Sequence, residues 1–223
     1  PMVACNYSVG EPGGKAACKT ALQAIVGLPE RDVPLVGMIT RISWQKGTDV
    51  VLAAIDSILE HDDMQLVMLG VGDPFYEDAY REVVRRHPGK VCALFRFDVP
   101  LAHLIEAGSD FFLMPSRYEP CGLSQMYSMA YGTIPIVHKT GGLADSVRPV
   151  TKANLAAGQA TGIVFSPCDP EALTKAVRRA LKLYNTPNDL QAVRETAMRQ
   201  DFSWNRSAQA YVDLYRGAVA SQR

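Results

Sequence analysis

The sequence lacks the cysteine pattern of a metal or redox site. Its five cysteines, Cys5, Cys18, Cys92, Cys121 and Cys168, are odd in number and widely scattered. None shows the C-x-x-C spacing that is typical of zinc sites and redox centres. The four histidines also lack the spacing of metal ligands. We therefore predict no bound metal and a reducing compartment, which is the cytoplasm or, for a plant or algal protein, the plastid stroma.

Long apolar runs and an excess of charge of one sign are missing too. No run approaches the ~20 apolar residues that cross a bilayer, and the first residues lack the regions of a signal peptide. Lysine plus arginine, 23, balances aspartate plus glutamate, 23, so no overall field favours nucleic acid or an anionic membrane as a partner. The 223 residues, 48% hydrophobic, predict a soluble globular protein. Its first residue, Pro1, indicates a piece of a longer protein.

Two common phosphate-binding signatures are incomplete. Gly70-Val71-Gly72 begins like a dinucleotide fingerprint, but Phe75 stands where the third glycine is needed. The stretch "GEPGGK", residues 10–15, is one residue short of a P-loop and follows no predicted strand. We therefore predict neither NAD nor any other cofactor.

What the sequence does contain is a regular alternation of β-rich runs and helical segments. The predicted strands are 35–40, 65–69, 91–95, 111–114, 134–137 and 162–165, and the predicted helices between or after them are 48–59, 74–86, 101–107, 123–131 and 170–183. This order predicts an α/β fold, a doubly wound parallel sheet with helices on both faces. Further helices are expected at 15–25 and at 191–216, split at 201–204, and a mobile loop at 150–161.

Ligands of such sheets bind beyond the carboxyl ends of the strands, so the residues that follow each strand are candidates. Arg41 and Lys46 lie on a turn that starts a helix, where both can reach one phosphate cluster. An arginine fork and a lysine point charge suit a diphosphate. The alternative is that both are solvated loop cations.

The stretch "SRYEPCGLSQ", residues 116–125, follows the apolar run "FFLM". Gly122 and Leu123 are expected to open the next helix and to offer backbone N–H groups to an anion. Glu119 is then a negative charge beside a positive pocket. It either caps the helix or binds a polyhydroxylated group attached to the phosphate, such as a sugar that passes through an oxocarbenium-like state.

Two further residues are weaker candidates. Phe97 follows the third predicted strand, where it either stacks on a base or packs in the core. Cys121 lies beside the predicted anion site, but no histidine adjoins it in sequence, so we do not interpret it as a nucleophile.

Several motifs together resemble those of the retaining glycogen and starch synthases, glucosyltransferases of the two-domain GT-B type. The motifs are "GKAACKTALQAIVGLP", "RISWQKG", "LGVGD", "PSRYEPCGLSQMYSMAYGTIPIVHKTGGLADSV", "ATGIVF" and "DFSW". They occur in the family's order along nearly the whole chain. The resemblance implies the C-terminal half of a GT-B fold and transfer of glucose from ADP-glucose to the non-reducing end of an α-1,4-glucan, with retention of configuration.

The resemblance also implies roles for single residues. Arg41 and Lys46 would hold the donor diphosphate and stabilise the leaving ADP, and Glu119 would contact the glucosyl hydroxyls. These three are the predicted catalytic residues. The predicted donor-binding set adds Phe97, beside the adenine, and the loop residues Cys121, Gly122, Leu123 and Ser124, of which Leu123 and Ser124 would offer backbone N–H groups to phosphate.

The resemblance further implies a division of the chain. Residues 1–28 would be an interdomain linker and first helix, 29–200 the nucleotide-sugar-binding domain, and 201–223 a crossover helix that packs on the absent N-terminal domain. Without that partner we expect little activity, and self-association through the exposed last helix. The alternatives are a related GT-B transferase with another nucleotide sugar, or a non-catalytic module that binds a nucleotide sugar or glucan.

Overall fold

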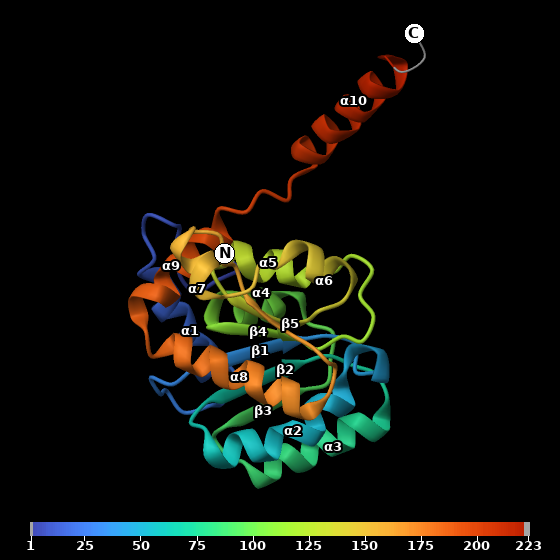
Figure 1. Cartoon of the computed structure of the whole chain (residues 1–223). Helices are drawn as coiled ribbons and strands as arrows, with labels where there is room; N and C mark the ends of the chain where they lie inside the picture. The colour runs from blue at the N-terminus through green and yellow to red at the C-terminus, as the bar shows by residue number, and fades with distance from the viewer. Residues whose placement is uncertain (1, 221–223) are drawn as a thin grey trace.

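The computed structural model describes residues 2–220 and has one six-stranded parallel sheet at its centre (Figure 1). The order of the strands is β3-β2-β1-β4-β5-β6, and every neighbouring pair is parallel. Their bounds are Leu35–Ile39 (β1), Gln65–Leu69 (β2), Val91–Leu94 (β3), Phe111–Met114 (β4), Ile134–His138 (β5) and Ile163–Phe165 (β6). The predicted α/β fold and all six predicted strands are therefore confirmed.

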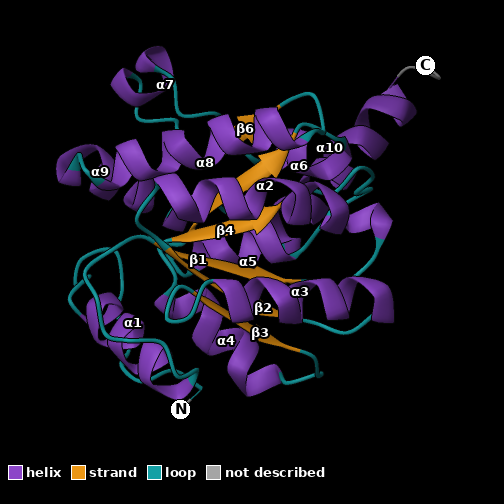
Figure 2. Cartoon of the chain, turned by 90° about the horizontal axis from the view of Figure 1, so that it is seen from below, coloured by secondary structure: helices purple, strands orange, loops and turns teal. Residues whose placement is uncertain are grey.

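Helices cover both faces of the sheet, as predicted (Figure 2). One face carries α2, α3 and α8, and the other carries α1, α4 and α5. The helices are Gly14–Ile25 (α1), Thr48–His61 (α2), Pro74–Arg86 (α3), Val99–Gly108 (α4), Ser124–Ala130 (α5), Gly141–Ser146 (α6), Lys152–Ala156 (α7), Pro170–Tyr184 (α8), Pro187–Met198 (α9) and Trp204–Ala220 (α10). A 3-10 turn, Trp44–Lys46, precedes α2.

Three of these helices start at an aspartate that a proline follows within two residues. Asp73, Asp98 and Asp169 accept hydrogen bonds from backbone N–H groups in the first turns of α3, α4 and α8, and each of these turns contains a proline. The carboxylate satisfies an N–H that has no partner inside the helix, and proline has no N–H to satisfy. These caps fix where each helix leaves the carboxyl edge of the sheet.

The helical predictions differ most from the structure at three places. The segment 150–161, predicted as a mobile loop, contains α7, whose first turn is capped by the Thr151 hydroxyl. The helix α6 was not predicted, and α9 begins at Pro187 rather than at residue 191. Helices of five or six residues complete too few turns to show a 3.6-residue period, so the sequence pattern does not reveal α6 or α7.

The last helix, α10, projects away from the rest of the molecule (Figure 1). Every residue from Trp204 to Ala220 is exposed, and Trp204 itself is 84% exposed. The helix confirms the predicted split at 201–204. Residues 221–223 of the predicted crossover segment lie outside the described residues.

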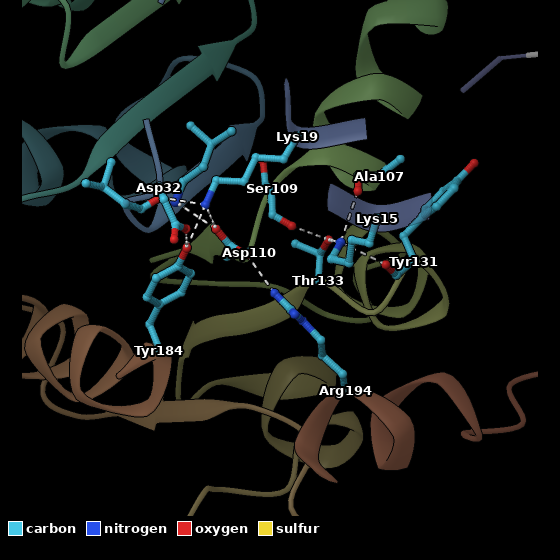
Figure 3. A network of polar contacts seen from close by, with 12 residues as sticks. Lys15, Lys19, Asp32, Ala107, Ser109, Asp110, Tyr131, Thr133, Tyr184 and Arg194 are labelled. Atoms are coloured by element: carbon cyan, nitrogen blue, oxygen red, sulfur yellow. Dashed lines mark hydrogen bonds and ion pairs between the residues drawn. The ribbon is translucent and has the colours of Figure 1, made fainter. Parts of the chain in front are cut away.

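A buried polar network lies at the amino ends of the strands (Figure 3). Asp110, just before β4, accepts from Lys19 Nζ at 2.7 Å, from an Arg194 nitrogen at 2.6 Å and from the Leu35 N–H at 3.1 Å. It thereby joins α1, α9 and β1. This network lies at the edge of the sheet opposite the predicted ligand site.

Lys15 makes a second part of this network. Its ammonium group donates to the carbonyls of Ala107 and Tyr131, each at 3.0 Å, and to the Thr133 hydroxyl at 2.7 Å. Burial lowers the pKa of Lys15 well below its usual value, because the charged form loses its hydration. The three acceptors replace part of that hydration.

Candidate functional site

The strand order of the sheet reverses between β1 and β4, and a cavity of about 360 Å³ opens there. Both strands contribute their carboxyl ends to it, which is where open α/β sheets bind ligands. The lining residues are Met38, Ile39, Thr40, Arg41, Lys46, Leu113, Met114, Pro115, Ser116, Glu119, Gly122, Leu123 and Ser124. Six predicted site residues, Arg41, Lys46, Glu119, Gly122, Leu123 and Ser124, are thus brought to one cavity. We call it the switch-point cavity.

Gly47 lets the β1–α2 loop approach β4 closely. Its φ is 73°, in the left-handed region that favours glycine, and a Cβ there would overlap the carbonyl oxygen of Pro115. The 3-10 turn before it ends with Lys46. The glycine in "QKG" therefore allows Lys46 to reach the loop that follows β4.

Lys46 and Glu119, which are 73 positions apart, form an ion pair in the switch-point cavity. Lys46 Nζ lies 2.5 Å from Glu119 Oε2, and the Ser116 hydroxyl donates to the same oxygen at 3.2 Å. Glu119 is only 8% exposed, whereas Arg41 is exposed. The cavity therefore contains one exposed cation, Arg41, and one cation, Lys46, that forms an ion pair with a buried carboxylate.

The capping interpretation of Glu119 was wrong. Helix α5 begins at Ser124, one residue after the start of the predicted helix 123–131, with Leu123 at its N-cap and no side-chain cap bond. The Glu119 carboxylate binds Lys46 and Ser116 instead.

Two glycines that follow β5 hold the backbone of Glu119. The Gly142 N–H donates to the Glu119 carbonyl at 3.0 Å. Gly141, at φ 39°, could not carry a Cβ without overlapping that same oxygen. The "TGG" segment after β5 thus supports the Glu119 peptide from its backbone side, while Lys46 holds the carboxylate.

A second cavity, of about 280 Å³, lies beside the first and is lined mostly by apolar atoms. Its walls include Leu69, Val71 and Phe97, and it shares Ile39, Thr40 and Arg41 with the switch-point cavity. Phe97 is 87% exposed, so the interpretation of this residue as part of the core was wrong. We call the first cavity, which contains the charged side chains of Lys46 and Glu119, the polar compartment and the second the apolar compartment.

One predicted residue lies outside both cavities, and sequence reasoning missed others. The Cys121 side chain is exposed and lines neither cavity, and its carbonyl accepts from Gln125. Ser116 and Thr40 line the switch-point cavity but were not predicted. Thr40 is the last residue of one predicted strand and Ser116 lies just after another, so a fuller search of strand ends could have found them.

The described part of the structure contains neither a cluster of metal ligands nor a helix that could span a membrane. Over residues 2–220, no three His, Cys, Asp or Glu side chains gather in a way that could hold a metal ion. Across the same range, each helix is too short or too polar to cross a bilayer.

The fold and the cavity at the strand-order reversal define a Rossmann-like, doubly wound α/β domain of the kind found in GT-B enzymes. The family described as glycosyl transferases group 1 matches residues 22–196. The chain belongs to that family.

Named relatives resemble nearly the whole chain. A glycogen synthase of Anaeromyxobacter dehalogenans (strain 2CP-C) is 50% identical over 217 residues, which make up 97% of this chain and 45% of the relative. The catalytic domain of starch synthase IV from Arabidopsis thaliana, solved with ADP and acarbose, superposes with a TM-score of 0.88 at 35% identity. That match covers 99% of this chain and 46% of the other.

A more distant structure shares the fold. Sucrose-phosphate synthase from Thermosynechococcus elongatus superposes with a TM-score of 0.65 at 26% identity over 90% of this chain. The chain spans about half the length of the relatives that it matches, and in the glycogen synthases the matched part is the C-terminal half.

Proposed function

We propose that this chain is the donor-binding half of a retaining glucosyltransferase of the glycogen and starch synthase type. The donor is ADP-glucose, and the complete enzyme transfers its glucose to the non-reducing end of an α-1,4-glucan. The observation that carries the proposal is the pair of adjoining cavities, one polar and one apolar, which share Arg41. The 50% identity to a glycogen synthase and the ADP bound to the similar starch synthase domain support it.

The polar compartment suits the diphosphate and the sugar. Arg41 and Lys46 would bind the phosphates and neutralise the charge that develops on the departing ADP. The Lys46 ammonium group has three N–H donors and gives one to Glu119, so it could donate to a diphosphate at the same time. Glu119 would then accept hydrogen bonds from glucosyl hydroxyls. The backbone N–H groups of Leu123 and Ser124, at the start of α5, would complete the phosphate site.

The apolar compartment suits the base. Phe97 presents an exposed aromatic face on which adenine would stack, with Leu69 and Val71 in the same wall. Arg41 lines both compartments, so it would lie between the base and the phosphates of a bound nucleoside diphosphate. We propose that no metal ion or cofactor takes part.

The other half of the reaction cleft would come from the N-terminal domain of the complete enzyme. The apolar side of α10, which includes Ala208, Tyr211, Val212 and Tyr215, would pack on that domain. In its absence the same side favours self-association. We expect a cytoplasmic protein, or a plastid one in a plant or alga, and little transferase activity from the 223 residues alone.

Calorimetric titration of the 223-residue chain with ADP tests the donor site. We expect weak binding, and a loss of about 10- to 100-fold in affinity for both Arg41→Ala and Lys46→Ala, since a hydrogen bond to a charged group contributes roughly 1.5–3 kcal/mol. Lys175→Ala is the control, because Lys175 pairs with Glu171 on the surface of α8. Absence of ADP binding, or equal affinity of all four proteins, would refute the site.

Glucan elongation by the complete enzyme tests the catalytic role. Glu119→Ala should lower kcat strongly while the protein stays folded. Full activity of that variant would instead indicate a module that binds without catalysis. Comparison of ADP-glucose with UDP-glucose as donors then decides between this reaction and that of a related transferase.

A further inference from the structure

The structure contains an arginine that lines neither cavity but joins the two loops from which the switch-point cavity is built. Arg117 lies on the loop between β4 and α5, two residues before Glu119. Its guanidinium donates to both carboxylate oxygens of Asp49, at 2.6 and 2.7 Å. Such a two-bond fork fixes the direction as well as the distance of the contact. Asp49 lies in the first turn of α2, three residues after Lys46.

Arg117 also holds the other side of Lys46. The guanidinium donates to the Trp44 carbonyl at 2.8 Å and lies 4.5 Å from the centre of the Trp44 ring. The Arg117 N–H donates to the Gln45 carbonyl at 2.9 Å. The segment that carries Lys46 is therefore held by Arg117 both before and after the lysine.

The same residue ties its own loop to a third one. The Thr140 hydroxyl donates to the Arg117 carbonyl at 3.2 Å, just before the two glycines that support the Glu119 peptide. With 22% of its side chain exposed, Arg117 is largely covered, and its contact with Asp49 raises the pKa of the guanidinium. Arg117 and Asp49 neutralise one another, so the pair adds little net charge to the nearby cavity.

We propose that Arg117 is a positioning residue, which sets the distance between Lys46 and Glu119 by locking the β1–α2 loop to the β4–α5 loop. The proposal rests on the function proposed above for those two side chains. Arg117 lines neither cavity, so it would act on the donor only through them. Lysine could not replace it, because a single ammonium group lacks both the planar fork and the stacking face.

The variant Arg117→Lys tests this with a crystal structure and without any ligand. We expect the Lys46 Nζ to Glu119 Oε2 distance to increase from 2.5 Å to beyond ion-pair contact, with the sheet unchanged. Arg86→Lys is the control, because Arg86 forms a similar two-bond contact with Asp56 and lines neither cavity. An unaltered Lys46–Glu119 pair in Arg117→Lys would overturn the proposal, whether or not ADP binds.

ADP titration of a double-mutant cycle separates positioning from a general loss of stability. Arg117→Lys should weaken ADP binding about 5- to 10-fold in the natural sequence but have no effect in Lys46→Ala, because contacts that act through one another are not additive. An equal loss in both backgrounds would refute action through Lys46. If Lys46→Ala weakens ADP binding and Arg117→Lys does not, the proposed function stands and the positioning role fails.

Discussion

Replacement of Asp110 by asparagine should destabilise the fold strongly and leave the ligand site intact. Asp110 is 5% exposed and binds Lys19, Arg194 and the Leu35 N–H (Figure 3). The side-chain amide of asparagine keeps one acceptor oxygen but carries no charge. The variant Asp110→Asn therefore leaves two largely covered cations without their counter-ion.

The contacts set the size of the effect. Breaking a buried ion pair costs about 3–5 kcal/mol. Lys19 keeps two other acceptors, the Val33 carbonyl at 2.6 Å and the Tyr184 hydroxyl at 2.9 Å, so we expect the lower limit, about 3 kcal/mol. For a chain of this length, that corresponds to a fall of about 6–12 °C in Tm.

Thermal and urea unfolding, followed by circular dichroism, measure this loss. The control Asp56→Asn removes a carboxylate that pairs with Arg86 and His87 but is 40% exposed, so it should cost at most about 1 kcal/mol. ADP affinity well below Tm should be unchanged in both variants, because Asp110 lies at the amino end of β4 and the cavity at its carboxyl end. If Asp110→Asn is no less stable than Asp56→Asn, the buried network does not stabilise the fold as argued.

Two further predictions concern the apolar compartment and the buried carboxyl group of Glu106. Phe97→Ala should lower ADP affinity about 5- to 100-fold, since stacking on a base contributes roughly 1–3 kcal/mol. Tm should be unchanged, because Phe97 is 87% exposed. Phe75 lies outside both cavities, so an equal loss of ADP affinity in the control Phe75→Ala would contradict the prediction. Burial raises the pKa of Glu106 to about 7. Between an unfolded pKa of about 4.3 and this value the folded state binds more protons, so stability falls as pH rises through that window. Glu106→Gln should remove up to about 3 kcal/mol of that fall in urea unfolding from about pH 4 to 8, and identical slopes for both proteins would count against it.

Much of the site could be predicted because parallel strands bring their carboxyl ends to one edge. That rule alone placed Arg41, Lys46 and Glu119 near a common ligand, and the structure brings them to one cavity. The roles of these residues remain predictions. The exposure of Phe97 could not be predicted, since an aromatic residue after a strand is compatible with either the core or the surface.

Other features required contacts between distant parts of the chain. The Lys46–Glu119 pair and the contact of Arg117 with Asp49 join residues 73 and 68 positions apart. No local pattern marks such partners, because each side chain would suit a solvated loop equally well. The buried contacts of Asp110 are hidden for the same reason.

The sequence by itself determined the order of the six strands and of the longer helices, the starts of α3 and α8, and the loops that carry the candidate site. These follow from local periodicity and capping, which act over a few residues. Only the tertiary structure decided that the switch-point cavity adjoins an apolar compartment, and that its lysine and glutamate pair with each other. Such distances depend on how the sheet packs and where its loops meet, and packing is a property of the whole chain.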